Sequence, residues 1–417
     1  MPISATAAKA ATRTISVDQA LERILARLAP LPAVEAALAD ALGAVLATDV
    51  VADRDVPPFR NSAMDGYAVR GADVVAAPAR LRVIGEVAAG TVPAAAVGAG
   101  EAMRIMTGAP MPDGADTVVR VEDTDDGRET VTITKPVPLG VSVRAAGEDL
   151  RAGETILREG TVLRPAELGV LATLGRGRIR IVPRPLVIVL STGDELVELD
   201  EAVGPGQIRD ANRYSLAAAA RMAGARVESG GIVRDTTEAL RSALGAAAAR
   251  ADVIITSGGV SVGDHDHVKP VVDELGTMDF WSIAIRPGRP LAFGELRGTD
   301  HPVPIFGLPG NPVSSLLTFE LFVRPALLRL AGRTRLERPR AEARLLEPID
   351  TPSGLRFFAR GIHDPSSGTV RTTGPQGSGI LRSMSLANCL IDVPADIDHV
   401  GTGATVTVIL TDRPEDH

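Results

Sequence analysis

Residues 253–269, VIITSGGVSVGDHDHVK, join a strand-like run to residues that can hold a phosphate and a cation. The apolar, β-branched VIIT predicts a buried strand. Glycines follow it, and glycine lets backbone N–H groups approach an anion closely. Asp264 and Asp266 come next, and carboxylates suit a hard cation such as Mg²⁺, which often bridges protein to phosphate. The simpler alternative is a tight glycine turn followed by solvated aspartates.

Zinc is a poorer match to the same segment. His265 and His267 alternate with the aspartates, but no cysteine lies nearby and no HExxH helix pattern follows. We therefore expect a site for a hard cation and not for a transition metal.

Two more turns follow predicted strands. Leu186–Leu190 leads into STGDE, and Val303–Leu308 leads into PGNP, where Pro312 is expected to open a helix whose N-terminus can bind an anion. Parallel strands bring their carboxyl ends to one edge of a sheet, so three such turns predict a shared ligand crevice. The alternatives are a capped helix start at Asp194 and Glu195, and a Pro/Gly turn without a ligand.

The segment RPGRP places Arg286 and Arg289 three residues apart around a rigid turn. Each guanidinium offers a planar fork of donors, so the pair can form a pocket for a tetrahedral oxyanion. Ser314, in the first turn of the predicted helix after PGNP, can donate to such an anion as well. Two ordinary surface arginines are the alternative.

The elements that must position these residues alternate from Arg184 to about Gly332, which predicts a parallel sheet between two helix layers. Asp235 is expected to cap one of the helices, with Glu238 as its capping-box partner. The expected strands are 186–190, 226–233, 253–256 and 303–308, and the expected helices are 214–224, 236–250 and 312–330.

The rest of the chain predicts three further domains. A stretch of short β-type runs, broken by Gly and Pro, is expected to be inserted into a discontinuous helical and mixed domain, with two helices between Val17 and Leu46 and a third at 165–174. Five short strands near the C-terminus predict a small β barrel or sandwich. The expected domains are 14–53 with 149–180 (linker and dimerisation), 54–148 (inserted β), 181–332 (α/β) and 333–417 (β barrel).

Composition excludes several classes of protein. A net charge of −8 argues against nucleic-acid binding, because phosphate neutralisation needs a basic face. The single cysteine, Cys389, cannot form an internal disulfide and fits a reducing compartment. No apolar stretch approaches the roughly 18 residues that a transmembrane helix needs, and the N-terminus lacks the apolar core of a signal peptide.

Together these segments resemble the MoeA-type molybdopterin molybdenumtransferases, the family that includes the gephyrin E domain. They occur in that family's order over residues 61–315, and FFARG and QGSGIL extend the resemblance to about residue 380. The segments are NSAMDGYA, RIMTGAPMP, AAGEDL, STGDEL, SGGVSVGDHDHVK, FWSIAIRPGRPLAFG and GLPGNPVSS.

The resemblance implies an enzyme that inserts molybdenum into molybdopterin. Adenylylated molybdopterin would be hydrolysed in the presence of molybdate and Mg²⁺, releasing AMP and molybdenum cofactor. It also implies a cytoplasmic homodimer of four-domain subunits, with the active cleft between the α/β domain of one subunit and the β domain of the other. The implied partners are a molybdopterin adenylyltransferase and apo-molybdoenzymes, with no nucleic acid and no membrane.

The family's functional positions carry over to residues of four kinds. Asp266, with Asp264, is the implied Mg²⁺ ligand near the phosphates. The implied catalytic positions are Asp266, Glu195, Asp65, Thr107, Asp149 and Asp235. The implied substrate-binding positions are Thr192, Gly193, Asp194, Gly258, Gly259, Ser261, Gly263, Pro309, Gly310, Asn311 and Pro312. The implied molybdate-binding positions are Arg286, Arg289, Pro290, Ser314, Arg360 and Ser378.

One segment departs from the family's usual FWKLAIKPGKP. Two lysines become Arg286 and Arg289, and a third basic position becomes Ser282. Arginine keeps the charge but changes reach and geometry, so molybdate affinity and discrimination against tungstate stay open.

Two competing functions also stay open. One is a molybdopterin adenylyltransferase, although such enzymes are often the α/β domain alone and this chain carries flanking β domains. The other is a non-catalytic molybdopterin-binding or scaffold paralogue, with a second copy carrying the main activity.

Overall fold

The computed structural model describes residues 14–258, 268–299 and 301–411. The chain divides into two compact units. Unit 1 consists of residues 1–34, 43–45 and 182–417, and unit 2 consists of residues 35–42 and 46–181.

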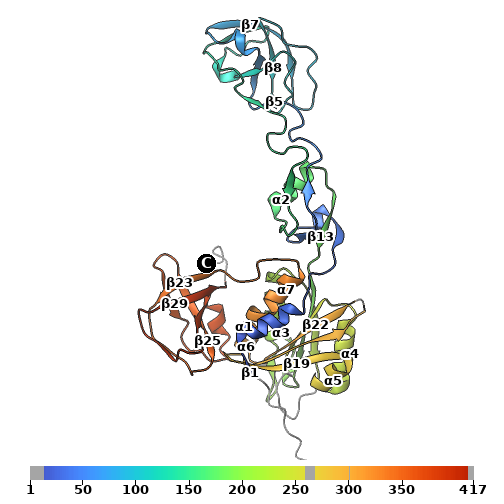
Figure 1. The fold of residues 1–417 in the computed structure, drawn as a ribbon, viewed down its shortest axis with the longest axis vertical. Helices are drawn as coiled ribbons and strands as arrows, with labels where there is room; N and C mark the ends of the chain where they lie inside the picture. The colour runs from blue at the N-terminus through green and yellow to red at the C-terminus, as the bar shows by residue number, and fades with distance from the viewer. Residues whose placement is uncertain (1–13, 259–267, 300, 412–417) are drawn as a thin grey trace, which may run out of the picture. The chain divides into compact units, whose positions relative to one another are not determined.

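A seven-stranded sheet in the order β1-β19-β21-β22-β18-β14-β17 forms the centre of unit 1 (Figure 1). Its four predicted strands are parallel neighbours, which confirms that prediction. Two strands that were not predicted, β19 and β21, continue the sheet in antiparallel fashion. Residues 284–289, which include β20, connect them, and this connection is too short for the crossover that parallel strands need. The bounds are β1 Thr14–Ile15, β14 Leu186–Thr192, β17 Arg226–Val233, β18 Val253–Ser257, β19 Gly276–Ile283, β21 Pro290–Arg297 and β22 Pro302–Leu308.

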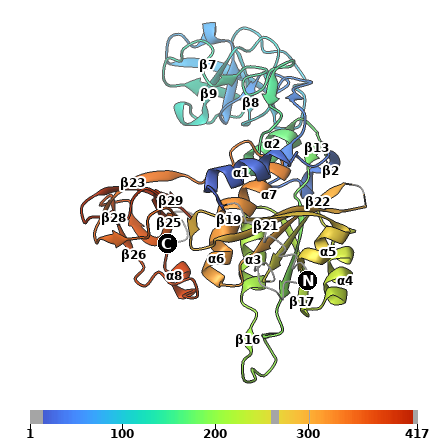
Figure 2. The same cartoon turned by 60° about the horizontal axis from the view of Figure 1, so that its bottom comes forward.

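Helices cover both faces of this sheet, as predicted (Figure 2). On one face α4 and α5 pack over an apolar core that includes Leu240, Leu244 and Ile254. The other face carries α1, α3 and the predicted long helix after PGNP, which runs as α6, the π-helical turn η4 and α7. The bounds are α1 Val17–Ala26, α3 Asn212–Met222, α4 Thr237–Ala248, α5 Val268–Leu275, α6 Pro312–Thr318, η4 Phe319–Val323 and α7 Arg324–Leu330.

The structure corrects one predicted helix cap and rules out a helix start that the sequence left open as an alternative. Thr236, and not Asp235, is the N-cap of α4, and its hydroxyl accepts a hydrogen bond from the Ala239 N–H at 3.3 Å. Asp194 and Glu195 do not start a helix. They form a turn before β15 (Leu196–Val197), which pairs with β16 (Ile208–Arg209).

The C-terminal part of unit 1 is the predicted β barrel. The order β25-β26-β23-β29-β27, with a further β25–β27 pairing, closes five strands into a ring around an apolar core. The strand β20 (Ile285–Arg286) pairs with the barrel strand β25, so the RPGRP segment joins the sheet to the barrel. The bounds are β23 Arg340–Leu345, β24 Ile349–Asp350, β25 Arg356–Asp364, β26 Thr369–Thr372, α8 Arg382–Ser385, β27 Cys389–Val393, β28 His399–Val400 and β29 Thr405–Leu410.

Unit 2 contains a five-stranded sheet in the order β10-β7-β8-β6-β9, which confirms the mostly-β prediction for this region. Apolar clusters around Tyr67 and Met103 form its core. Its bounds are β6 Gly66–Val69, β7 Ala79–Val87, β8 Glu101–Ile105, β9 Thr117–Arg120 and β10 Thr130–Ile133, with the 3-10 turns η2 Gly71–Asp73 and η3 Val121–Asp123.

The predicted second helix before Leu46 is wrong. Its alanine-rich sequence suits a helix, but Val34–Ala37 forms the strand β2, which pairs with β13, and tertiary pairing overrides the local propensity. The predicted helix near 165–174 is confirmed as α2. The remaining bounds are η1 Leu38–Asp40, β3 Val45–Leu46, β4 Val50–Val51, β5 Asn61–Ser62, β11 Val143–Arg144, β12 Thr155–Leu157, α2 Pro165–Thr173 and β13 Arg178–Val182.

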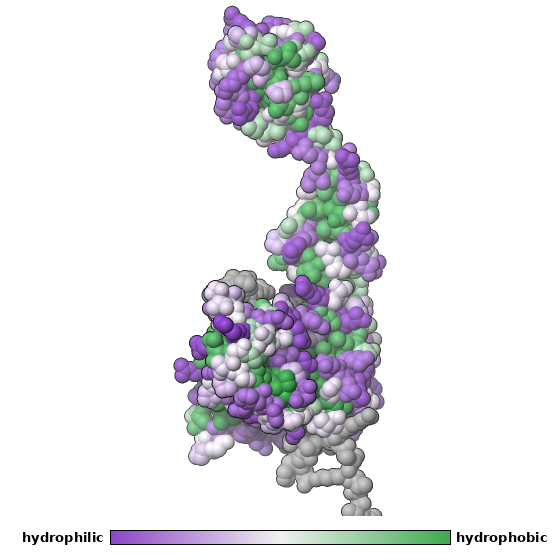
Figure 3. All heavy atoms as spheres, turned by 60° about the vertical axis from the view of Figure 1, so that its left-hand side comes forward, coloured by the Kyte–Doolittle hydropathy of each residue, from purple (hydrophilic) through white to green (hydrophobic). Residues whose placement is uncertain are grey.

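Polar and apolar side chains are mixed over the face that Figure 3 presents. Among the residues that the structure describes, no helix is both long and apolar enough to cross a membrane.

Candidate functional site

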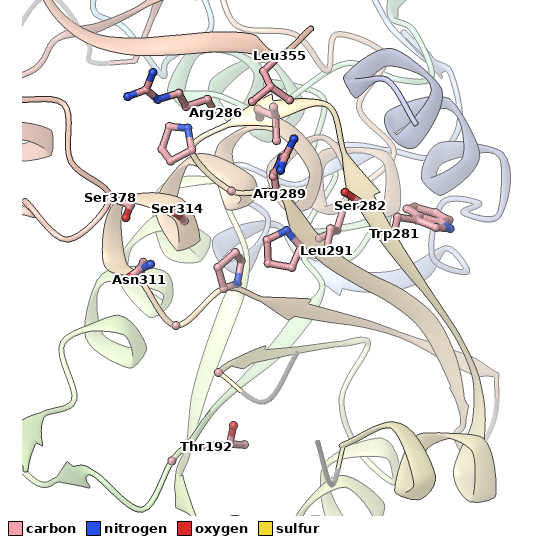
Figure 4. A pocket seen from close by; sticks show the side chains of 18 of the residues that line it. Thr192, Trp281, Ser282, Arg286, Arg289, Leu291, Asn311, Ser314, Leu355 and Ser378 are labelled. Atoms are coloured by element: carbon pink, nitrogen blue, oxygen red, sulfur yellow. The ribbon is translucent and has the colours of Figure 1, made fainter. Parts of the chain in front are cut away.

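A cavity of about 1180 Å³ opens in unit 1 at the carboxyl ends of the parallel strands (Figure 4). All three predicted turns line it, and so do the RPGRP segment and residues of the C-terminal barrel. The shared crevice predicted from the strand-end turns is therefore present. Its lining includes Thr192, Gly193, Glu195, Asp235, Gly258, Pro309, Gly310, Asn311, Arg286, Arg289, Pro290, Ser314 and Ser378.

Glycine is required at the turn after β18. Gly258 has a φ of +90°, and a Cβ there would lie 2.4 Å from the Thr192 carbonyl oxygen. Its N–H donates to the Leu308 carbonyl at 3.1 Å, which ties this turn to the end of β22. The turn thus approaches its neighbours more closely than any side chain would allow.

One side chain that was not predicted holds two of the turns together. The Nδ2 amide group of Asn212, at the start of α3, donates to the Ser257 hydroxyl at 2.8 Å and to the Gly310 carbonyl at 2.7 Å. The sequence signal was available only in part, because the helix was expected to start at Tyr214.

A buried hydroxyl group lies at the same edge of the sheet. Thr192 is 4% exposed, and its Oγ1 is buried with no hydrogen-bond partner in the described part of the chain. It therefore offers a donor to a ligand in the cavity, at a position expected to bind substrate.

At the barrel side, arginine and serine side chains gather. Ser314, in the first turn of α6, lies beside Ser378, and the Val313 N–H donates to the Ser378 carbonyl at 3.1 Å (Figure 4). The Arg286 guanidinium stacks over the Phe357 ring at 5.1 Å, whereas Arg289 points elsewhere and is exposed. The two arginines of RPGRP line one cavity, but they do not form a single fork.

Arg360, another residue expected to bind molybdate, does not line the cavity, since its side chain is fully buried. Its Nε donates to the Ser383 hydroxyl at 3.0 Å and its Nη2 to the Gly377 carbonyl at 3.1 Å. Its Nη1 is buried and has no partner among the described residues. Burial, followed by the positive charge of Arg286, lowers the pKa of Arg360 to about 10.

Neither Arg286 nor Arg360 forms an ion pair within the part of the chain that the structure describes. Two neighbouring cations without a carboxylate partner are unfavourable unless an anion offsets them. With the hydroxyls of Ser314 and Ser378 nearby, this arrangement can bind a tetrahedral oxyanion.

Two carboxylates lie at the opposite, turn-lined side of the cavity. Glu195 is exposed, and Asp235 is half-buried with an Oδ1 that has no hydrogen-bond partner among the described residues. Asp194 accepts a hydrogen bond from the Asp235 N–H at 3.4 Å. No group of three or more His, Cys, Asp or Glu side chains that could hold a metal ion occurs among the residues described.

Three predicted catalytic residues lie in unit 2. The Asp65 carboxylate accepts hydrogen bonds from the Thr107 N–H at 2.7 Å and from its hydroxyl at 2.8 Å, and these bonds lower the pKa of Asp65. Asp149 lines a separate cavity of about 410 Å³ together with Asn61, whose Oδ1 is buried and unpartnered among the described residues.

Five predicted site residues lie outside the described residues, so their arrangement stays a prediction. They are Gly259, Ser261, Gly263, Asp264 and Asp266.

Three family models match most of the chain. They are the "MoeA N-terminal region (domain I and II)" over residues 15–175, the "Probable molybdopterin binding domain" over 188–329 and the "MoeA C-terminal region (domain IV)" over 342–411.

Curated relatives and solved structures agree with these matches. The chain is 41% identical to molybdopterin molybdenumtransferase 2 of Mycobacterium tuberculosis, over 89% of this chain and 93% of that protein. It is 36% identical to the molybdopterin molybdenumtransferase of Haemophilus influenzae, over 94% and 98%. The molybdopterin biosynthesis MoeA protein from Pyrococcus horikosii superposes with a TM-score of 0.80 and 32% identity, over 95% of this chain and 99% of that one. The chain therefore belongs to the MoeA family of molybdopterin molybdenumtransferases.

Proposed function

We propose that this protein inserts molybdenum into molybdopterin, with molybdate as the molybdenum source. The observation that carries the proposal is one cavity that joins two different kinds of binding surface. Glycine turns at the carboxyl ends of the strands line one side, and an arginine and serine pocket lines the other. A phosphate-bearing pterin and a molybdenum oxyanion are a pair of substrates that suits such a cavity.

The turns would hold the phosphate-bearing end of an adenylylated molybdopterin. The Gly258 and Val313 N–H groups already donate to the Leu308 and Ser378 carbonyls and so hold the turns in place. The glycine turns let the backbone approach the phosphates closely, and the Thr192 hydroxyl can donate to the ligand. Preorganised donors of this kind stabilise the charge that develops as a phosphoanhydride breaks. Breaking that bond with water would release AMP.

The pocket of Arg286, Arg360, Ser314 and Ser378 would hold molybdate. Arg360 supplies a buried positive charge, and its Nη1 amino group has no partner among the described residues, which favours an anion over water there. Arg286 in place of the family's usual lysine keeps the charge, so we expect oxyanion binding to be retained.

The carboxylates at the cavity would bind Mg²⁺. The half-buried Asp235 has an unpartnered Oδ1 among the described residues and lines the cavity with Glu195, and oxygen donors of this kind fit a hard cation. Asp264 and Asp266 would complete the ligand set. When bound, Mg²⁺ would neutralise charge on the phosphates. Glu195 would orient the attacking water through its exposed carboxylate.

The second unit is proposed to act in a homodimer. Asp65, Thr107 and Asp149 of one subunit would then complete the active cleft of the partner subunit. The homodimer would act in the cytoplasm. A molybdopterin adenylyltransferase would supply its substrate, and apo-molybdoenzymes would receive its product.

The test supplies purified protein with two alternative substrate mixtures and measures AMP. With adenylylated molybdopterin, Mg²⁺ and molybdate, we expect AMP release that depends on molybdate. An adenylyltransferase would instead consume ATP with free molybdopterin.

Asp266→Asn keeps the side-chain size and removes the charge, so a transferase should lose AMP release while it still folds and binds pterin. An unchanged phenotype of this variant in cells would favour the scaffold.

A further inference from the structure

We propose that Ser383 is a positioning residue that holds the Arg360 guanidinium in the orientation needed to bind the oxyanion. This inference rests on the proposed function, because it assumes that Arg360 meets molybdate. Ser383 lies in the short helix α8 and is not one of the residues expected from the family resemblance.

The hydrogen bonds of Arg360 occupy two of its three guanidinium nitrogens. Nε and Nη2 are each bound to the protein, through Ser383 and the Gly377 carbonyl, and Nη1 is buried but unpartnered among the described residues. A guanidinium is planar, so fixing two of its nitrogens fixes where the third one points. Arg360 therefore presents one remaining donor group in a set direction.

The Ser383 hydroxyl is itself fixed as an acceptor for the Arg360 Nε–H group. The residue is 3% exposed, and its hydroxyl donates to the Ile380 carbonyl at 2.6 Å. A hydroxyl carries one proton, so this bond leaves only lone pairs for the Arg360 Nε–H. The contact is charge-assisted and cannot reverse its polarity.

This restraint acts against a repulsion. Arg286 and Arg360 are neighbouring cations, and the charge of Arg286 contributes to the lowered pKa of Arg360. Without an anion, repulsion favours any rotation that separates the two guanidinium groups. We infer that Ser383 and Gly377 keep the Arg360 guanidinium close to Arg286, so that both charges act on one oxyanion bound in the cavity.

The experiment replaces Ser383 by Ala and compares it with a matched change in the same helix. Ser385→Ala removes a similar bond, since the Ser385 hydroxyl donates to the Arg382 carbonyl at 2.9 Å, but Ser385 is exposed and does not touch Arg360. Ser383→Thr keeps the hydroxyl. Molybdate alone is the probe, measured by equilibrium dialysis, followed by KM values for molybdate and for adenylylated molybdopterin.

We expect Ser383→Ala to weaken molybdate binding roughly tenfold, because one charge-assisted hydrogen bond is lost. The KM for adenylylated molybdopterin should stay unchanged, Ser383→Thr should restore molybdate binding, and Ser385→Ala should match wild type. If Ser383→Ala fails to fold, Ser383→Cys decides, since sulfur is a weaker acceptor of similar size and should give the same loss.

Three outcomes would overturn the inference. Unchanged molybdate binding in a folded Ser383→Ala protein removes the positioning role and leaves the proposed function intact. Equal increases in both KM values, with a lower unfolding temperature, mean that Ser383 is only structural. Wild-type protein that binds no molybdate and transfers no molybdenum removes the proposed function, and the role of Ser383 with it.

Discussion

At the scale of single residues, Arg286 lines the cavity and the buried Arg360 lies close to it, and neither has an ion-pair partner among the described residues. Arg360 is fully buried, carries a pKa lowered to about 10, and keeps an unpartnered Nη1 among the described residues. A base whose pKa falls on folding reduces stability at every pH below that lowered pKa, and the cost fades only as pH rises above it. At neutral pH Arg360 is therefore charged, and an anion would relieve the cost.

Molybdate should consequently raise the unfolding temperature of the wild-type protein. A ligand that binds only the folded state adds about 2.7 kcal/mol at one hundred times its dissociation constant. Arg360→Met should lose this stabilisation, whereas Met in place of Arg371, an exposed arginine of β26, should retain it. Thermal denaturation with and without molybdate gives the comparison, and equal shifts in both variants would argue against a role for Arg360.

Asp65 allows a test of pH dependence in unit 2. Two hydrogen bonds from Thr107 lower the pKa of the Asp65 carboxyl group, so their contribution to stability is present above the unfolded pKa of about 3.9 and is lost as pH falls through the lower folded pKa. Thr107→Val removes the hydroxyl and keeps the N–H donor, and should raise the pKa of Asp65. Carbon NMR of the carboxyl group measures it. Thr117→Val, next to Asp116, should leave it unchanged.

At the scale of elements, the site depends on how closely the ends of β14, β18 and β22 approach one another. Gly258 meets the Thr192 carbonyl, and Asn212 ties Ser257 to Gly310. These contacts join segments far apart in sequence, and they set the spacing of the donors around the cavity.

Gly258→Ala should therefore cost about 1–3 kcal/mol, because it forces a side chain into a left-handed conformation and against a backbone oxygen. Gly310→Ala is the matched control in the same cavity, since its added Cβ would meet nothing nearer than 4.0 Å. Chemical denaturation should separate the two variants. Similar stabilities would mean that the turn after β18 is less constrained than its geometry indicates.

Asn212→Asp keeps the side-chain shape and replaces both N–H donors with a carboxylate oxygen. We expect a higher KM for adenylylated molybdopterin and an unchanged KM for molybdate, because the two turns separate while the arginine pocket is untouched. Asn388→Asp is the control: its Nδ2 group donates to the His363 carbonyl in the barrel at 2.9 Å. This variant should lose some stability without altering the KM for the pterin. A wild-type KM in Asn212→Asp would refute the positioning role of Asn212.

The sequence predicts what depends on local pattern. Apolar runs and turn residues correctly predict β14, β17, β18 and β22, the crevice at the ends of β14, β18 and β22, and the barrel strands. The same reasoning misplaces Val34–Ala37, where an alanine-rich run pairs as a strand. It also misses Asn212 and Ser383, since a hydrogen bond to Gly310 or Arg360 depends on contacts across 98 and 23 residues that no local pattern encodes.

At the scale of the whole molecule, the residues proposed to bind or transform the substrate are divided between two units. The turns and the arginine pocket lie together in unit 1, whereas Asp65, Thr107 and Asp149 lie in unit 2. Each unit has its own apolar core. We therefore expect that unit 1 alone holds both the pterin phosphate and the oxyanion, and that unit 2 contributes to turnover.

The most direct test measures molybdenum bound to the pterin after incubation of the protein with adenylylated molybdopterin, Mg²⁺ and molybdate. We expect AMP and molybdenum-loaded pterin in equal amounts for wild type, with both reduced in Arg360→Met. Tight binding of the pterin with neither AMP nor transferred molybdenum would contradict this expectation and would leave a binding or scaffold protein.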